Sequence, residues 1–132
     1  MGPKDHSLKT GILEGVRVLD LSRMLSGPYA TMLLADHGAE VIKIESAEGD
    51  TSRRSGPFKE NDTKKDWSGY FISLNRNKKS ICLNLKKKED LNFLKKLIED
   101  ADVLVENFRP NVMKRLGLSF EEVSKINPSI VY

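Results

Sequence analysis

Aromatic, amide and basic side chains gather in the segment VENFRPNVMKRLG, residues 105–117. Asn107, Phe108 and Arg109 follow directly on an apolar run that is typical of a strand, and Arg115 lies further along the same segment. An aromatic ring can stack on a flat base, an amide can bind the polar edge of a base, and guanidinium groups bind phosphate. This combination favours a ligand that carries both a flat base and phosphate groups.

Residues suited to a binding site also follow three other predicted strands. In an open parallel sheet the carboxyl ends of the strands lie at one edge, and ligands bind there. Helix N-termini add affinity for anions at the same edge. The residues brought to this edge are Arg23, Met24, Leu25, Ser26 and Gly27 after the strand 16–21, Glu45 and Ser46 after the strand 41–45, and Lys86 after the strand 81–85.

Structural roles explain some of the same residues. Phe108 can close the edge of the sheet, Arg115 can cap a short helix, and Lys86 belongs to a KKK run that is typical of a solvated surface. Glu45 stands where the ribose-binding acid of a dinucleotide site would stand, but the loop SRMLSGPYA lacks the G-x-G-x-x-G pattern. Nicotinamide binding is therefore the poorer hypothesis.

The first part of the chain predicts a strand, a helix and a second strand. The segment 16–21 has the apolar pattern of a strand, and the period then changes to that of a helix over about 27–37. Ser26 is expected as the N-cap of this helix, and Gly38 suits the positive φ that follows a helix. Because the strand 41–45 follows closely, a right-handed parallel crossover is expected. We predict an α/β fold, a Rossmann-like parallel sheet with flanking helices.

The middle of the chain predicts a long loop followed by two further strands. Residues 46–69 are rich in glycine, serine and charge, and loops of this length are typically functional or disordered. The apolar pattern of 81–85 predicts a third strand that buries Cys82 in the core, and a fourth strand is expected at 103–107. Between these strands an amphipathic helix is predicted, with an apolar face made of Leu91, Leu94, Leu97 and Ile98.

The last segment predicts two short helices and the start of a fifth strand. The first helix is expected between Pro110 and Gly117, and Ser119 and Glu122 have the spacing of a capping box for the second. NPSIVY predicts a strand that begins at the end of the sequence. Because a central parallel strand is normally followed by a covering crossover, we expect the chain to be the first part of a longer domain and to self-associate through its uncovered edge.

The composition fits one soluble globular domain of 132 residues, 39% hydrophobic and 31% charged. The net charge of +3 favours anionic partners only mildly, so no nucleic acid is expected as a partner. No apolar run reaches the ~18 residues of a membrane span, so no membrane association is expected. Residues 1–11, expected to be a disordered lead-in, carry no secretion signal. The single cysteine suits a reducing compartment, the cytoplasm or the mitochondrial matrix, and no metal-ligand spacing is present.

Longer segments of the chain carry a recognisable pattern. They are LEGVRVLDLSRMLSGPYATMLLADHGAEVIKIE, GDTSR, YFISLNRNKKSICLNLK, ADVLVENFRPNVMKRLG and NPSIVY. In this order they resemble the N-terminal part of the family III coenzyme A-transferases, also called the CaiB/BaiF family, over residues 12–132. This is the group of carnitine CoA-transferase, formyl-CoA transferase and succinyl-CoA:glutarate CoA-transferase.

The resemblance implies a fold, an activity and a set of contacts. Residues 12–132 would be a truncated portion of the large domain of the family, whose full-length members form interlocked homodimers. Members move CoA from an acyl-CoA to a carboxylic acid through an enzyme carboxylate. Acyl-CoA and a carboxylic acid are thus the expected substrates, without a tightly bound cofactor. The implied CoA contacts are Met24, Leu25, Ser26, Ser46, Leu83, Asn84, Leu85, Lys86, Asn107, Phe108, Arg109 and Arg115.

The resemblance also implies what this chain lacks. The nucleophilic aspartate of the family is expected beyond Tyr132, so no catalytic residue is assigned here and the chain alone is expected to be inactive. Formyl-CoA transferases have glutamine at the position of Leu25 and arginine at that of Ser46, which disfavours formyl-CoA and oxalate as substrates. Two alternatives stay open: a fragment of an acyl-CoA racemase of the same family, and a non-catalytic nucleotide-binding or interaction module.

Overall fold

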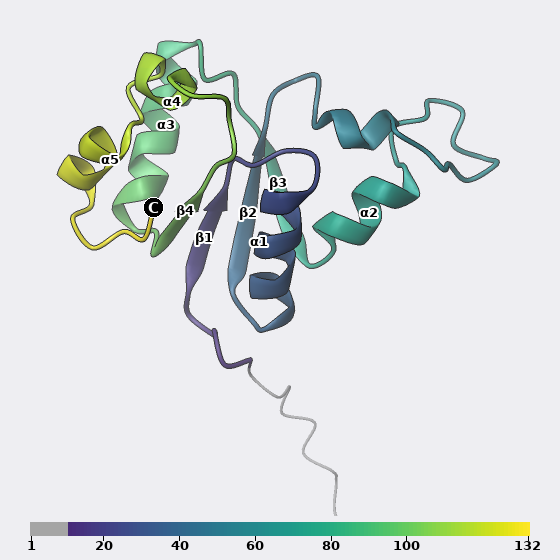
Figure 1. Ribbon diagram of the computed structural model, residues 1–132, viewed down its shortest axis with the longest axis horizontal. Helices are drawn as coiled ribbons and strands as arrows, with labels where there is room; N and C mark the ends of the chain where they lie inside the picture. The colour runs from purple at the N-terminus through teal and green to yellow at the C-terminus, as the bar shows by residue number, and fades with distance from the viewer. Residues whose placement is uncertain (1–10) are drawn as a thin grey trace, which may run out of the picture.

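The computed structural model describes residues 11–132, which build a four-stranded parallel sheet between two layers of helices (Figure 1). The predicted lead-in, residues 1–11, lies outside the described residues except for its last position. The strand order is β3-β2-β1-β4, and every pairing is parallel. The α/β prediction of a Rossmann-like parallel sheet with flanking helices is therefore confirmed. The strands are β1 (Arg17–Asp20), β2 (Glu40–Glu45), β3 (Lys78–Cys82) and β4 (Val103–Val105).

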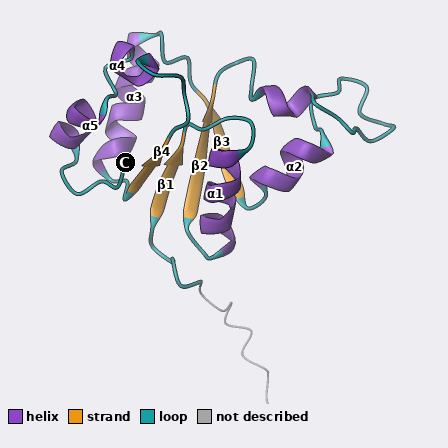
Figure 2. Cartoon of the chain, viewed as in Figure 1, coloured by secondary structure: helices purple, strands orange, loops and turns teal. Residues whose placement is uncertain are grey.

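The helices divide between the two faces of the sheet, with α1 and α2 on one side and α3, α4 and α5 on the other (Figure 2). Successive strand residues point to opposite faces. Val18 of β1 accordingly packs in a cluster with Ala35 of α1, whereas Leu19 packs with Leu94 and Ile98 of α3. The helices are α1 (Ser26–Asp36), η1 (Thr51–Arg54, a 3-10 turn), α2 (Gly69–Asn75), α3 (Lys88–Glu99), α4 (Val112–Arg115) and α5 (Phe120–Ile126).

The start of α1 differs from the prediction. Ser26 is already the first helical residue, and the N-cap is Leu25, which makes no side-chain cap hydrogen bond. The chain enters the helix through Met24, whose φ of 68° is held from outside the helix by hydrogen bonds from its backbone N–H to Asp50. A tertiary contact thus replaces the local cap. Gly38 adopts a φ of 103° after the helix, as predicted.

The third strand begins earlier than predicted and lies at the edge of the sheet. β3 covers Lys78–Cys82 rather than 81–85, and the preceding helix α2 was not predicted. The alternation of Ile81, Leu83 and Leu85 continues past the strand because these side chains pack against the α3 side of the core. The expectation that Cys82 is buried was wrong, since an edge strand has uncovered positions and Cys82 is exposed.

The C-terminal segment keeps the predicted order of elements but not all of the predicted contacts. Ser119 is the N-cap of α5, yet its side chain makes no cap hydrogen bond. Glu122 pairs instead with Lys125 at 2.8 Å, so the capping box does not form. Val131 makes a single parallel bridge to Val103, which is the only trace of a fifth strand among residues 11–132. The fourth strand ends at Val105, two residues before the predicted 107.

Neither a membrane span nor a metal cluster is found in the described part of the chain. None of the helices in residues 11–132 combines the length and the apolar character that a bilayer crossing requires. The same residues hold no group of three or more His, Cys, Asp and Glu side chains that could bind a metal ion.

Candidate functional site

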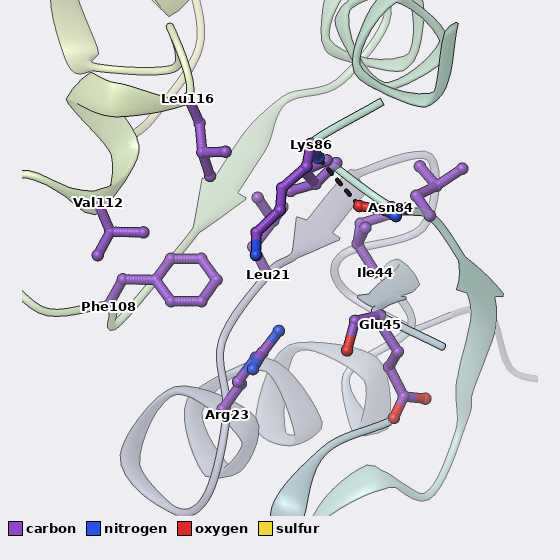
Figure 3. A pocket seen from close by; sticks show the side chains of 12 residues that line it. Leu21, Arg23, Ile44, Glu45, Asn84, Lys86, Phe108, Val112 and Leu116 are labelled. Atoms are coloured by element: carbon purple, nitrogen blue, oxygen red, sulfur yellow. Dashed lines mark hydrogen bonds between the residues drawn. The ribbon is translucent and has the colours of Figure 1, made fainter. Parts of the chain in front are cut away.

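A cavity of about 310 Å³ opens at the carboxyl edge of the sheet (Figure 3). Its floor is apolar, and polar groups stand at its rim, which is the character expected of a small-molecule site. The walls come from the ends of β1, β2 and β3, from the segment after β4, and from α4. The lining residues are Leu21, Arg23, Ile44, Glu45, Ser46, Leu83, Asn84, Leu85, Lys86, Phe108, Val112 and Leu116.

Half of the predicted contact residues lie in this cavity. The convergence follows from parallel strand order, because β2 and β3 are neighbours and both end at this edge. Phe108 reaches the same place from the far side of β1, where it faces the leucines of the floor (Figure 3). The predicted residues that line the cavity are Ser46, Leu83, Asn84, Leu85, Lys86 and Phe108.

The other predicted residues lie near the cavity but do not line it. Arg109 lines a neighbouring hollow that it shares with Phe108, and Arg115 is exposed in the last turn of α4. Met24, Leu25 and Ser26 are exposed in the loop that leads into α1, close to Asn107. Ligand contact by the six predicted residues outside the cavity stays a prediction.

The Asn107 side chain fastens the loop after β1. Its Oδ1 accepts the backbone N–H of Arg23 at 2.8 Å, and its Nδ2 donates to the carbonyl oxygen of Arg23 at 2.8 Å. The side-chain amide is thereby paired at both ends with one residue of the loop. Each end of the amide keeps one further hydrogen-bonding position, so Asn107 holds the loop in this arrangement and its contact with a ligand stays a prediction.

A buried ion pair holds the same loop from the other side. The Nζ of Lys43 lies 3.2 Å from Asp50 Oδ2 and donates to the carbonyl oxygen of Ser22 at 2.9 Å. The side chains of Lys43 and Asp50 are 1% and 0% exposed. Burial opposes ionisation of Asp50, but hydrogen bonds from Ser52 and the charge of Lys43 lower the pKa of Asp50 below its ordinary value. The loop is therefore fixed before any ligand binds.

Glu45 is fully occupied by protein groups. Arg53 donates to both of its oxygens, at 2.8 and 2.6 Å, and Ser80 Oγ and the backbone N–H of Asp50 donate at 2.6 and 3.0 Å. Burial would raise the pKa of Glu45, but the hydrogen bonds from Arg53 and Ser80 outweigh it and lower that pKa to about 2. The Arg53 guanidinium also stacks on Phe71, 3.7 Å from the ring centroid. Glu45 therefore has no oxygen left to bind a ribose, which removes the basis of the dinucleotide hypothesis.

Asp20 is buried and paired in the same way. It accepts hydrogen bonds from Thr31 Oγ1 at 2.6 Å, from the Ser22 backbone N–H at 2.9 Å and from Ser22 Oγ, and it forms an ion pair with Lys78 Nζ at 2.9 Å. Burial lowers the pKa of Lys78 below its ordinary value, and the charge of Asp20 opposes this only in part. Asp20 is thus a structural residue that ties β1 to α1 and β3.

Sequence reasoning missed the apolar walls of the cavity, and it assigned no ligand contact to one cation at the edge, Arg23. Val112 begins α4 and Leu116 is its C-cap, four positions later, a spacing that could have revealed them. Leu21 and Ile44 belong to predicted strand ends. Arg23 was predicted to lie at this edge, but no local pattern predicts that its guanidinium lies 5.4 Å from the Phe108 ring centroid.

Comparison with known proteins gives a family match over almost the whole chain. The model of CoA-transferase family III matches residues 13–132. A succinyl-CoA:glutarate CoA-transferase of Mus musculus is 49% identical over 121 residues, which are 91% of this chain and 27% of the relative. An acyl-CoA transferase of Fusarium pseudograminearum is 45% identical over 131 residues, covering 96% of this chain and 29% of the relative. The chain thus spans less than a third of the length of these relatives.

Solved structures agree with the family match. A CAIB/BAIF family protein from Brucella suis superimposes with a TM-score of 0.86 at 36% identity, over 94% of this chain and 33% of that protein. A protein from Mycobacterium tuberculosis gives a TM-score of 0.85 at 35% identity, over 93% of this chain and 34% of that protein.

Proposed function

Because this chain belongs to CoA-transferase family III, we propose that it is the N-terminal portion of an acyl-CoA:carboxylate CoA-transferase and binds the nucleotide end of coenzyme A. One observation carries the proposal: an apolar cavity with an aromatic wall, Phe108, has the cation of Lys86 at its rim. An adenine ring buries its faces in such a cavity, and the phosphates of CoA meet the cation.

The proposed pose places the adenine against Phe108 and the leucines of the floor. Base–aromatic stacking contributes ~1–3 kcal/mol. Ser46 and Asn84 at the rim carry hydroxyl and amide groups that suit the ribose and phosphate oxygens. The remaining predicted contacts follow the rest of the CoA molecule along the edge of the sheet, and they are Met24, Leu25, Ser26, Arg109 and Arg115.

We further propose that this chain binds CoA without transferring it. Transfer in the family requires a carboxylate nucleophile, which must be free to attack the thioester. Asp20, Glu45 and Asp50, which lie around the loop and the cavity, are each buried and bound by cations and other donors. Attack by any of them would break a buried ion pair at a cost of several kcal/mol, so none is suited to the reaction.

Calorimetric titration with CoA tests the binding proposal. Phe108→Ala should weaken CoA binding by roughly 5- to 150-fold, which corresponds to the loss of one stacked base. Phe93→Ala is the matched control, because Phe93 is an aromatic residue of α3 that is 50% exposed and does not line the cavity. Equal CoA affinity of the wild type and the Phe108→Ala variant would contradict the proposed pose.

Incubation with succinyl-CoA and glutarate tests the proposal on chemistry. We expect no glutaryl-CoA by mass spectrometry and no covalent CoA adduct on the protein. Turnover, or an adduct on Asp20, Glu45 or Asp50, would show that the chain carries its own nucleophile and would overturn this part of the proposal.

A further inference from the structure

Residues 58–67 form a loop whose two ends are joined at its base. Between η1 and α2 the chain swings away from the sheet and then returns (Figure 1). The backbone N–H of Gly69 donates to the carbonyl oxygen of Pro57 at 2.7 Å, and the N–H of Ser68 donates to the carbonyl oxygen of Arg53 at 3.1 Å. A surface loop with joined ends is an Ω-loop. Bonds outside the loop therefore hold its two ends together.

Inside this loop the backbone hydrogen bonds are local. Asp62 accepts the N–H of Lys65 at its carbonyl oxygen, at 3.2 Å, and the N–H of Trp67 at Oδ2, at 3.0 Å. The ion pair that links the loop to η1, Arg54 to Asp66, has a separation of 3.7 Å, and both side chains are largely exposed. Exposed ion pairs of this kind contribute little to stability. The loop can therefore open while the sheet stays intact.

The loop offers a protease basic side chains on a backbone that opens locally. Its exposed lysines are Lys59, Lys64 and Lys65. Lys65 has a φ of 53°, which is unfavourable for a residue with a side chain. Lys87, before α3, is also exposed, but its N–H donates to the carbonyl oxygen of Asn84 at 2.7 Å and its carbonyl oxygen accepts the N–H of Leu91 at 3.0 Å. Exposed loop tips are the preferred sites of proteolytic cleavage, so cleavage is expected in the loop first.

The strand order keeps the chain assembled after a cut in this loop. β1 and β2 precede the loop, β3 and β4 follow it, and the sheet order is β3-β2-β1-β4. The two strands of the first piece thus lie between the two strands of the second piece. The ion pair between Asp20 and Lys78, at 2.9 Å and with side chains at most 1% exposed, also joins the two pieces. Separation would break this buried pair and expose the core, and both changes are unfavourable.

We propose that residues 58–67 are a proteolytic processing site for a protease that cuts after basic residues. Cleavage between Lys64 and Lys65 breaks the C–N bond of that peptide, and water supplies a hydroxyl group to the Lys64 carbonyl carbon and a proton to the Lys65 nitrogen. The product is a two-chain protein that keeps the parallel sheet. Its two pieces are held by strand pairing and by buried contacts.

The cavity at the carboxyl edge contains side chains from both pieces. Leu21 and Ile44 come from the first piece, and Leu83, Phe108 and Val112 come from the second. The cavity is therefore complete only while the pieces stay together. On the basis of the function proposed above, CoA binding by the cleaved protein reports whether they do.

Limited digestion of the full chain with trypsin, followed by mass spectrometry, locates the first cut. Among residues 11–132 it should fall after Lys59, Lys64 or Lys65, and the masses distinguish it from a cut after Lys4 or Lys9. The triple variant Lys59→Gln, Lys64→Gln, Lys65→Gln should be cut at least ~10-fold more slowly within 11–132, because every other site requires a larger opening of the fold.

A matched control separates the loop from a general loss of lysines. The triple variant Lys87→Gln, Lys88→Gln, Lys96→Gln removes three exposed lysines around α3 and should be cut in the loop as fast as the wild type. A first cut elsewhere in 11–132, or equal slowing in the two triple variants, would refute the processing site.

A core variant distinguishes local opening from unfolding of the whole chain. Ile98 is fully buried, and Ile98→Val lowers the stability of the fold. Cleavage through global unfolding would be ~2- to 10-fold faster in Ile98→Val. Cleavage through local opening should have the same rate in this variant and in the wild type. An accelerated cut would contradict the local opening.

The cleaved protein itself tests the last part of the proposal. Its pieces should separate on a denaturing gel but elute together in gel filtration, with the circular dichroism spectrum of the intact chain. Separate elution or loss of the spectrum would overturn the two-chain product. If the intact chain binds CoA and the assembled two-chain protein does not, the retained cavity is refuted. If neither form binds CoA, the proposed function fails while the processing site stands.

Discussion

The Glu45–Arg53 pair predicts a specific dependence of stability on pH. Glu45 has a pKa of about 2 in the folded protein, against an ordinary value of 4.5, and its side chain is 6% exposed. A carboxyl group whose folded pKa is depressed contributes its full stabilisation above the unfolded value and loses it as the pH falls toward the folded value. The window is therefore from pH 4.5 down to about 2. At ~1.4 kcal/mol per pKa unit, the difference between the unfolded and the folded pKa of Glu45 corresponds to about 3 kcal/mol of folding stability.

Replacement of Glu45 with glutamine removes the titrating group and so isolates the contribution of Glu45 to the pH dependence of stability. At pH 7 the free energy of unfolding of Glu45→Gln, from urea denaturation followed by circular dichroism, should lie about 3 kcal/mol or more below that of the wild type. Between pH 7 and pH 3 the gap should narrow by about 2 kcal/mol, because the wild type alone loses this stabilisation.

A control variant shows whether the narrowing belongs to this pair. Glu60→Gln removes an exposed carboxylate of the loop 46–69 and should differ from the wild type by less than ~0.5 kcal/mol. If the difference in the free energy of unfolding between Glu45→Gln and the wild type stays constant from pH 7 to pH 3, the reasoning is refuted. The destabilisation would then come from altered packing and not from the lost charge.

Three further predictions concern the loop after β1 and the edge strand. Asp50→Ala leaves the buried Lys43 ammonium without a counter-charge and should lower the free energy of unfolding by ~3–5 kcal/mol; in urea denaturation the Lys43→Met, Asp50→Ala double variant should cost less than the sum of the single changes, and additivity would argue against the pair. Gly27→Ala would press a methyl group onto the buried Ser22 and should cost ~1–3 kcal/mol, whereas an unchanged thermal midpoint would mean that the contact relaxes freely. Cys82 is exposed and should react with a thiol reagent in the native state; full protection until denaturant is added would contradict its place on the edge strand.

The elements of the fold could be predicted because each leaves a local record in the sequence. The apolar face of α3, with Leu94 and Ile98 buried, follows from a helical period, and the positive φ of Gly38 follows from the need to end α1. The parallel sheet follows from strands joined by helical crossovers. The resemblance to the family rested on ordered segments of this kind, and the family match over residues 13–132 confirmed it.

One error came from a property of the whole sheet, and two came from local features that the sequence patterns do not resolve. Cys82 has the apolar neighbours of a core residue, but the strand order puts β3 at the edge, and order is a property of the whole sheet. Ser119 and Glu122 have the right spacing for a capping box, yet the Lys125 ammonium lies 2.8 Å from Glu122 and takes the carboxylate. Helix α2 was missed because its seven residues carry too few turns for a period to stand out.

The sequence by itself determined which strands end at the carboxyl edge of the sheet and which residue types follow them, since both depend on neighbours along the chain. The tertiary structure decided which of those side chains are free to act. Arg23 contacts Phe108 because Asn107, 84 residues away along the chain, holds the backbone of Arg23. Glu45 is not available to a ligand because Arg53 donates hydrogen bonds to both of its oxygens. The physical reason is that charge pairing and burial depend on distances in space, which are set only when remote segments of the chain have packed together.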